Sequence, residues 1–140
     1  ANDFPEQILG VKDSSYNLFE TLKIPNFKIF PGSETKLLKG LELNNSGIIS
    51  AVANVTASLA RKVYDDFHNK KKQTFNERLC AIRKVFDKNN LISGLHSFMS
   101  TEDEKYKIVL PPLSLLSKEQ EKQMMNELKA LDFYPERKAA

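Results

Sequence analysis

The chain has 140 residues, of which 41% are hydrophobic and 28% charged, as in an ordinary globular protein with one core. Its net charge is only +3 and its basic residues are spread along the chain, which argues against a nucleic-acid-binding surface. The single cysteine, Cys80, excludes an intrachain disulfide and is expected to be a small core residue. No apolar stretch approaches the roughly 20 residues of a membrane span, and no signal peptide is visible, so we expect a cytoplasmic protein.

The first half of the chain predicts strands that alternate with helices. Short apolar runs, typical of parallel strands buried on both faces, occur at residues 8–11, 27–30 and 48–52. The helices that follow these strands are predicted at residues 16–24, around 37–43, and 54–68. Repeated strand–helix pairs without hairpin signals predict right-handed crossovers and a parallel sheet.

The second half, residues 69–140, has a helical pattern instead. Apolar residues at helical spacing predict helices at residues 74–89 and 91–100. The sequence therefore divides into a strand–helix part, residues 1–68, and a C-terminal helical region, residues 69–140.

Two further signals predict the elements near the C-terminus. Two consecutive prolines predict an extended stretch at residues 107–113, because proline restricts the residue before it. Ser117, followed three residues later by Gln120, has the spacing of a capping box that starts a last helix, running to about Leu131. The tail from Asp132 to Ala140 is expected to fray.

The three predicted strands are too few to close a barrel. They would leave apolar strand edges open to water and to other chains. We therefore expect another segment, from the same protein or from a second chain, to cover this part of the sheet.

Lys12 directly follows the first apolar strand. In a βα barrel, residues at the C-terminal end of a strand face the active-site mouth. Partial desolvation there disfavours an ammonium, and a neutral amine can attack a ketone to form an iminium. Lys12 is thus a candidate nucleophile, and the alternative is a structural lysine that pairs with Asp13 or caps the sheet edge.

Further candidates lie at the other two predicted strands. Gly32 and Gly47 could let a substrate approach the backbone, or could serve backbone geometry alone. Ser33, Glu34 and Ser50 are polar groups near the same mouth. The alternative for Ser33 is an N-cap, and for Glu34 a first-turn acid that favours the helix dipole.

Four segments, in order, resemble one enzyme family. The run from Ile8 to Ser15 resembles the sixth strand of the dihydrodipicolinate synthase/N-acetylneuraminate lyase family, in which the lysine forms a Schiff base. Residues 30–34 are similar to its seventh-strand glycine segment, and residues 46–55 to its eighth-strand motif. Residues 110–114 resemble the stretch before its last helix. The resemblance covers nearly all of this chain but only the second half of the family's pattern.

The resemblance implies an α/β fold: a partial TIM (β/α)8 barrel, comprising the sixth to eighth βα units, followed by C-terminal helices. It implies that Lys12 forms a Schiff base with pyruvate, that Gly32 lies beside the bound substrate, and that Ile49 presents its backbone carbonyl to the catalytic centre. It places three side chains near the hydroxyls of a sugar-acid substrate: Ser33, Glu34 and Ser50. It implies no metal and no cofactor.

The implied reaction is reversible aldol cleavage or condensation of a 2-keto-3-deoxy sugar acid by a lyase. The alternatives are dihydrodipicolinate synthase, which condenses pyruvate with aspartate semialdehyde, and a non-catalytic half-barrel that acts as an interaction module. The family's carboxylate-binding threonine pair and its catalytic tyrosine belong to the absent first half, so this chain alone is expected to be inactive. The expected partners are the N-terminal half of the barrel and further copies, forming a dimer or homotetramer.

Overall fold

The computed structural model describes Ala1 and residues 3–135. Two strands, β1 (Gly10–Asp13) and β2 (Lys28–Pro31), pair in parallel, with Lys12 opposite Phe30. The helical elements are the 3-10 helix η1 (Glu34–Lys36), α1 (Leu37–Glu42), α2 (Ala53–His68), α3 (Asn76–Phe86), α4 (Leu91–Met99), the 3-10 helix η2 (Glu104–Lys107) and α5 (Lys118–Ala130). None of the helices in the described part of the chain combines the length and apolar character needed to cross a membrane.

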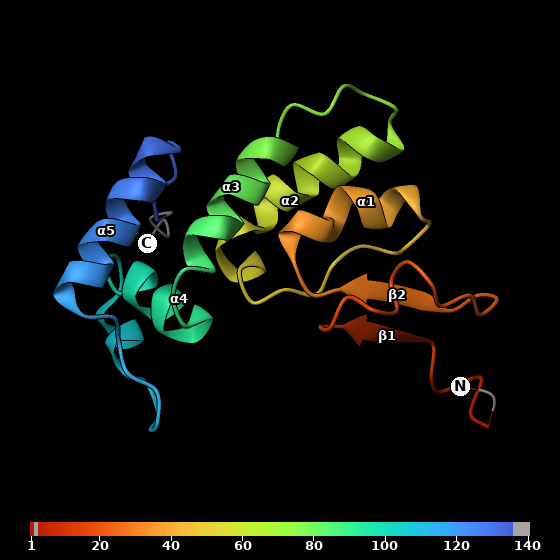
Figure 1. Ribbon diagram of the computed structural model, residues 1–140, viewed down its shortest axis with the longest axis horizontal. Helices are drawn as coiled ribbons and strands as arrows, with labels where there is room; N and C mark the ends of the chain where they lie inside the picture. Colours follow the sequence, from red (N-terminus) through yellow and green to blue (C-terminus); the bar gives the residue numbers. More distant parts are fainter. Residues whose placement is uncertain (2, 136–140) are drawn as a thin grey trace.

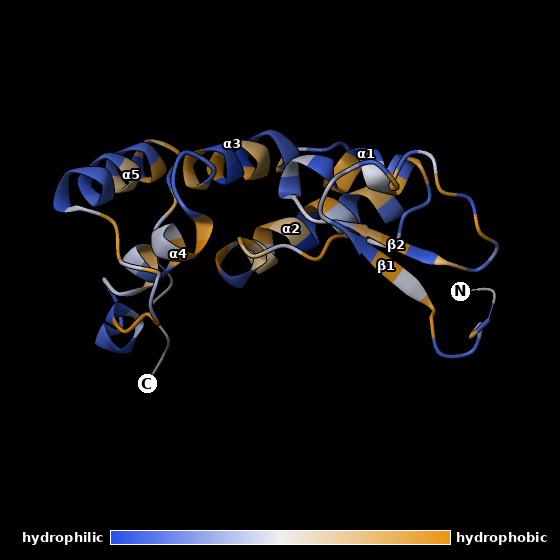
Figure 2. Ribbon diagram, turned by 60° about the horizontal axis from the view of Figure 1, so that its bottom comes forward, coloured by the Kyte–Doolittle hydropathy of each residue, from blue (hydrophilic) through white to orange (hydrophobic). Residues whose placement is uncertain are grey.

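The helices lie to one side of the strands and beyond their end. Helices α1, α2 and α3 lie above β1 and β2 in the view of Figure 1, whereas α4 and α5 lie at the opposite end of the molecule from the N-terminus. Figure 2 shows hydrophobic residues, in orange, along both strands as well as on the helices. The strands therefore carry apolar side chains, although within the described part of the chain β1 has β2 as its only strand neighbour and its other edge is open.

The core extends through the helices on both sides of the boundary predicted after residue 68. Its buried members are Leu37, Leu41, Val52, Leu59, Val63, Leu79, Ile82, Val85, Phe86, Leu95, Phe98, Met124 and Leu128. The Phe86 and Phe98 rings meet edge to face, with their centroids 5.6 Å apart, which is a favourable aromatic geometry. The strand–helix part and the helical region thus share one hydrophobic core.

The helix predicted at residues 16–24 is wrong. This segment forms turns around the buried carboxylate of Asp13, which accepts hydrogen bonds from the backbone N–H groups of Tyr16, Leu18 and Phe19. Tyr16 also has a φ of +59°, outside the right-handed helical region. A local carboxylate that satisfies backbone donors competes with helix formation, and here it prevails.

The third strand, predicted at residues 48–52, is also wrong. Ser46 N–H donates to the Ile29 carbonyl at 3.1 Å, and Ile49 N–H donates to the Pro31 carbonyl at 3.2 Å. The two donors are three residues apart, whereas the two acceptors on β2 are two residues apart. Residues 46–49 therefore contain one residue too many for a regular hydrogen-bond ladder with β2. Gly47, between the donors, has a φ of +142°, which favours glycine. The segment follows β2 without forming a strand.

The helices predicted from residue 54 onward are confirmed. Helices α2, α3 and α4 match the predicted ranges to within three residues at each end. Ser117 Oγ accepts from Gln120 N–H while Gln120 Oε1 accepts from Ser117 N–H, so the capping box starts α5 as predicted. Residues 108–113 contain neither helix nor strand, although Lys107 ends η2. Of the tail predicted to fray, residues 136–140 lie outside the described part of the chain.

Candidate active site

Lys12 lies on the open face of the strand pair. Neighbouring residues of a strand point to opposite faces, and register partners share a face. Asp13 and its partner Pro31 are buried, so their face is covered by the rest of the chain. Lys12 and its partner Phe30 therefore share the other face, where the Lys12 side chain is exposed.

Asp13 anchors the loop that follows Lys12. Its carboxylate accepts from the backbone N–H groups of Tyr16, Leu18 and Phe19 at 2.9 Å each. Burial acts to raise the pKa of Asp13, but these hydrogen bonds outweigh burial and bring the pKa below its ordinary value. The carboxylate is thus committed to the loop and does not support the alternative in which Asp13 pairs with Lys12.

Gly32 and Ser33 follow β2 and connect to neighbouring backbone. Gly32 N–H donates to the Asp13 carbonyl at 2.9 Å, which continues the pairing beyond the strands. Ser33 is buried, and its Oγ accepts from Thr35 N–H at 3.3 Å as the N-cap of η1. The N-cap alternative for Ser33 is therefore confirmed.

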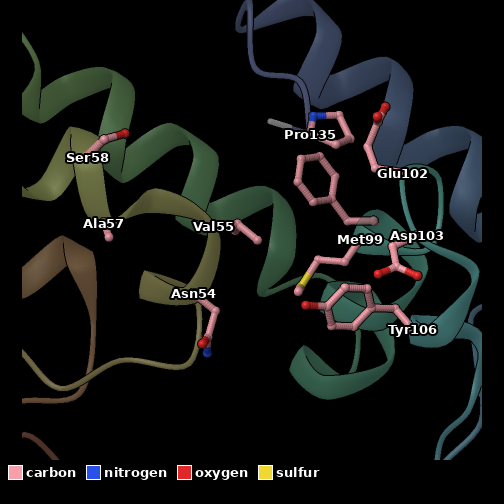
Figure 3. A pocket seen from close by; sticks show the side chains of 10 residues that line it. Asn54, Val55, Ala57, Ser58, Met99, Glu102, Asp103, Tyr106 and Pro135 are labelled. Carbon is pink, nitrogen blue, oxygen red and sulfur yellow. The ribbon is translucent and has the colours of Figure 1, made fainter. Parts of the chain in front are cut away.

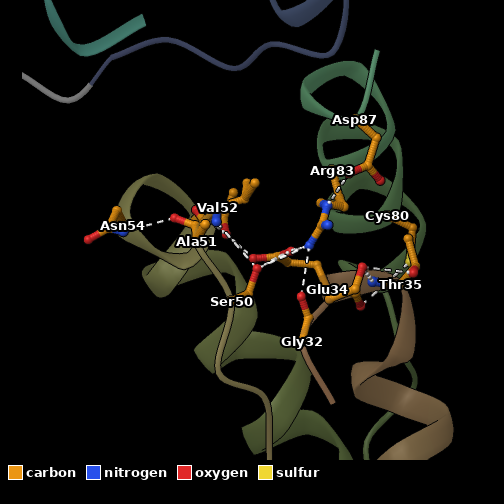
Figure 4. A network of polar contacts seen from close by, with 12 residues as sticks. Gly32, Glu34, Thr35, Ser50, Ala51, Val52, Asn54, Cys80, Arg83 and Asp87 are labelled. Carbon is orange, nitrogen blue, oxygen red and sulfur yellow. Dashed lines mark hydrogen bonds and ion pairs between the residues drawn. The ribbon is translucent and has the colours of Figure 1, made fainter. Parts of the chain in front are cut away.

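Glu34 is fully buried within a polar network, drawn in Figure 4. Its Oε2 accepts from Ser50 Oγ at 2.8 Å and from Arg83 Nη1 at 2.9 Å. Its Oε1 accepts from Thr56 Oγ1 at 3.3 Å. For Glu34 to touch a substrate, the carboxylate would have to leave these partners, so the geometry favours a supporting role behind Ser50.

Arg83, on α3, reaches back to the segment that follows β2. The residue is only 5% exposed, and its Nη1 also donates to the Gly32 carbonyl at 3.2 Å and to Ser50 Oγ at 3.1 Å. Its Nε donates to Asp87 at 2.8 Å. Burial acts to lower the pKa of Arg83, but its bonds to Glu34 and Asp87 outweigh burial and raise the pKa above its ordinary value.

Ser50 and Ile49 approach the strand end from the segment before α2. The Ser50 hydroxyl has one proton, donated to Glu34, and it accepts from Arg83 Nη1 and from Val52 N–H at 3.3 Å. Ile49 bonds to β2 through its N–H, and its side chain is exposed. The five candidate substrate-binding residues thus gather around the end of β2, with Lys12 on the neighbouring strand.

The sequence analysis missed Arg83 and Thr56. Arg83 lies four residues after Leu79 and three before Phe86, on the stripe of α3 that enters the core. A charged residue at a core position of an amphipathic helix requires a buried partner, and this signal could have identified it. Cys80, one turn before Lys84, is half-buried, and burial raises the pKa of its thiol.

A hollow of about 630 Å³ lies between the start of α2 and the region of α4 and η2. Figure 3 shows its lining side chains, with Asn54 and Ser58 on one wall and Met99 and Tyr106 on the other. Lys12 does not line it, and neither do the candidate residues around the end of β2. This hollow is therefore separate from the candidate active site.

Comparisons with known proteins identify the family and the fold of this chain. The sequence model of the Dihydrodipicolinate synthetase family, whose members are lyases with the TIM-barrel fold, matches residues 4–131. Dihydrodipicolinate synthase from Agrobacterium tumefaciens str. C58 is similar at 25% identity and a TM-score of 0.75, over 93% of this chain and 45% of that one. The comparison with curated proteins found no match.

Two further solved structures support the fold. A dihydrodipicolinate synthase from Bacillus anthracis has 16% identity and a TM-score of 0.77, over 89% of this chain and 46% of that one. A prophage protein of the dihydrodipicolinic acid synthase family from E. coli K12, in complex with pyruvate, has 18% identity and a TM-score of 0.69, over 90% of this chain and 47% of that one. The chain spans about half the length of these structures. The match over residues 4–131 shows that the chain belongs to the dihydrodipicolinate synthase family.

Proposed function

We propose that this chain supplies the Schiff-base lysine and the C-terminal part of the barrel of a class I pyruvate-dependent aldolase. The observation that carries the proposal is the position of Lys12 at the end of β1, exposed on the open face, in a chain of this family. A lysine at the C-terminal end of a barrel strand reaches the mouth in which barrel enzymes bind substrates.

The proposed reaction uses the neutral amine of Lys12. The amine attacks the keto carbon of a 2-oxo acid, and loss of water leaves an iminium. The hydroxyl on the far carbon of the breaking carbon–carbon bond loses its proton and becomes the carbonyl of the aldehyde that leaves. The iminium accepts the electron pair of that carbon–carbon bond, so an enamine of pyruvate remains. Protonation of the enamine and hydrolysis of the resulting iminium release pyruvate and regenerate Lys12. Condensation is the same sequence in reverse.

The open edge of β1 supports a half-barrel. Among the described residues, β1 pairs only with β2, whereas each strand of a closed barrel has two neighbours. Leu9, just before β1, and Ile49, beside β2, expose apolar side chains. We assign residues 1–68 to the sixth to eighth βα units and residues 69–140 to the C-terminal helices, with five further βα units covering the open face.

The preferred substrate is a 2-keto-3-deoxy sugar acid. In this proposal the backbone at Gly32 and Ile49 borders the bound keto acid, and the segments carrying Ser33 and Ser50 lie near its hydroxyls. Glu34 acts from behind by fixing Ser50. The second candidate, condensation of pyruvate with aspartate semialdehyde, is favoured by the similarity to the A. tumefaciens enzyme.

Borohydride trapping tests the proposed nucleophile. Reduction of the assembled barrel in the presence of pyruvate should leave a carboxyethyl group on Lys12 Nζ, which peptide mass mapping will locate. Lys12→Arg should abolish trapping and turnover, because a guanidinium stays protonated and forms no imine. Lys28→Arg, on the neighbouring strand, is the matched control and should still be labelled at Lys12. Labelling of Lys28 or Lys36 with Lys12 unmodified would rule out the assignment.

Comparing two assays then separates the substrates. Cleavage of a 2-keto-3-deoxy sugar acid without condensation of pyruvate and aspartate semialdehyde supports the preferred substrate. The opposite pattern, with pyruvate still trapped at Lys12, supports the second candidate. A site built to bond substrate hydroxyls rejects an analogue that lacks them, so the difference in rate should be large.

A further inference from the structure

We propose that Arg83 is a positioning residue for this site, through which the C-terminal helices hold the segments that bind the keto acid. This inference rests on the proposed function, because it concerns the two segments that border the proposed substrate. These are residues 32–34, after β2, and residues 50–52, before α2.

A single guanidinium joins both segments to α3. Arg83 Nη1 donates to the Gly32 carbonyl and to Glu34 Oε2 in the first segment, and to Ser50 Oγ in the second. Its Nε bonds to Asp87, one turn further along α3, so the guanidinium is held from its own helix as well. Arginine suits this role because its donors form a rigid planar fork.

The network fixes the direction of the Ser50 hydroxyl. Its one proton goes to Glu34, and its oxygen accepts from Arg83 and from Val52 N–H. The proton and both lone pairs of the Ser50 hydroxyl are thus all engaged within this chain. The network therefore fixes the backbone that borders the substrate, at residues 32–34 and 50–52. Arg83 acts through that backbone without touching the substrate.

The network is complete within this chain. Glu34 is fully buried and Arg83 is nearly so, even though the open face of the strands is uncovered. Removing one member of a buried ion pair leaves the other charge unpaired and strongly destabilises a fold, whereas replacing both by apolar residues of similar volume is often tolerated. The pair can therefore be removed as a unit, which separates positioning from folding.

The decisive variant is the double substitution Arg83→Met with Glu34→Leu, studied in the assembled barrel. We expect its thermal midpoint to stay near that of the wild type and pyruvate trapping at Lys12 to persist. The KM for the keto acid should rise about tenfold or more while kcat changes much less, because uniform binding is lost and the nucleophile is intact. Arg61→Met is the matched control: Arg61 pairs with Asp65 on the exposed side of α2, and its loss should leave KM unchanged.

Arg83→Lys supplies a second measurement. An ammonium can take the place of Nη1 beside Glu34, but it has no second nitrogen to bond Asp87, so the anchor of the side chain on its own helix is lost and the KM should be intermediate. An unchanged KM in a folded double variant would overturn the positioning role. If that variant does not fold, a wild-type KM in Arg83→Lys would overturn it instead. Absence of pyruvate trapping in the wild type would overturn the proposed function itself, and the positioning role with it.

Discussion

Helices α2 and α3 and the segment that enters β1 bury their apolar residues to different degrees. In α2 and α3, Val63, Leu79 and Phe86 are completely buried, although each helix is amphipathic and has a polar face. Just before β1, by contrast, Ile8 is 42% exposed and Leu9 is 57% exposed. Helices complete a core by packing in pairs, whereas strands that are apolar on both faces need a covering layer on each side. The difference indicates that α2 and α3 complete their core within this chain, whereas the edge at β1 needs a covering layer.

Supplying the missing layer should have the largest effect on the strand pair. Purified alone, the chain should associate, bind a dye for exposed apolar surface, and show no aldolase activity. Co-expression with a chain that carries the first five βα units should give a monodisperse and active assembly. The rate should fall by at least about 10²–10⁴-fold, because the resemblance assigns the family's catalytic tyrosine to the first half of the barrel and general acid–base catalysis alone contributes that much.

Size-exclusion chromatography and an aldolase assay check this prediction together. A helical fragment of similar size, co-expressed in place of the five βα units, is the control and should restore neither property. A monodisperse 16.0 kDa monomer that is active without a partner would contradict both the half-barrel and the need for a tyrosine.

A pair of leucines tests the same contrast by stability. Leu79→Ala removes a fully buried side chain from the helical core and should lower the free energy of unfolding by about 2–5 kcal/mol. Leu9→Ala should change it by less than about 0.5 kcal/mol in the isolated chain, because Leu9 is largely exposed there. In the assembled barrel, the cost of Leu9→Ala should rise as its side chain becomes covered. Urea denaturation measures all of these values, and an equal cost for Leu9→Ala in both states would show that the barrel does not cover this edge.

The same contrast explains which elements could be predicted from the sequence. The periodicity of Leu79, Ile82 and Phe86 reports the core side of α3 directly, because a helix places these residues on one face regardless of what lies further away. The turn of residues 16–24 could not be found in this way, because its apolar residues also fit a helix. What decides the conformation is the Asp13 carboxylate, which captures backbone donors up to six residues ahead.

The candidate site was predictable to a similar extent. Lys12 could be chosen because a charged residue directly after an apolar strand is unusual and its neighbours resemble a family motif. The partners of Glu34 could not be read from spacing, because Arg83 lies 49 residues away and meets Glu34 only after α3 packs beside η1. Local patterns located the segments that border the site, whereas the bonds that fix them depend on tertiary packing.

Asp13 gives a test with a smaller expected effect. Its carboxylate is buried and hydrogen-bonded within this chain, although the strand pair itself is open. Asp13→Asn keeps the size of the side chain but removes the charge that its three backbone donors stabilise. We expect a loss of about 1–3 kcal/mol in the free energy of unfolding, typical of weakened bonds to a buried charged group. Asp3→Asn, at an exposed position, is the matched control and should have almost no effect.

The pH dependence of this loss identifies its cause. Because the pKa of Asp13 is lower in the folded chain than in the unfolded chain, its carboxylate stabilises the fold fully above the unfolded pKa, about 3.9 for aspartate. The stabilisation is lost as the pH falls through the lower, folded pKa. The gap in unfolding free energy between wild type and Asp13→Asn should therefore be widest at neutral pH and narrow below about pH 4. Because every bond of Asp13 lies within this chain, the same profile should appear in the isolated chain and in the assembled barrel. A gap that does not change between pH 7 and pH 3, or one that appears only after assembly, would show that the carboxylate does not order the loop after Lys12.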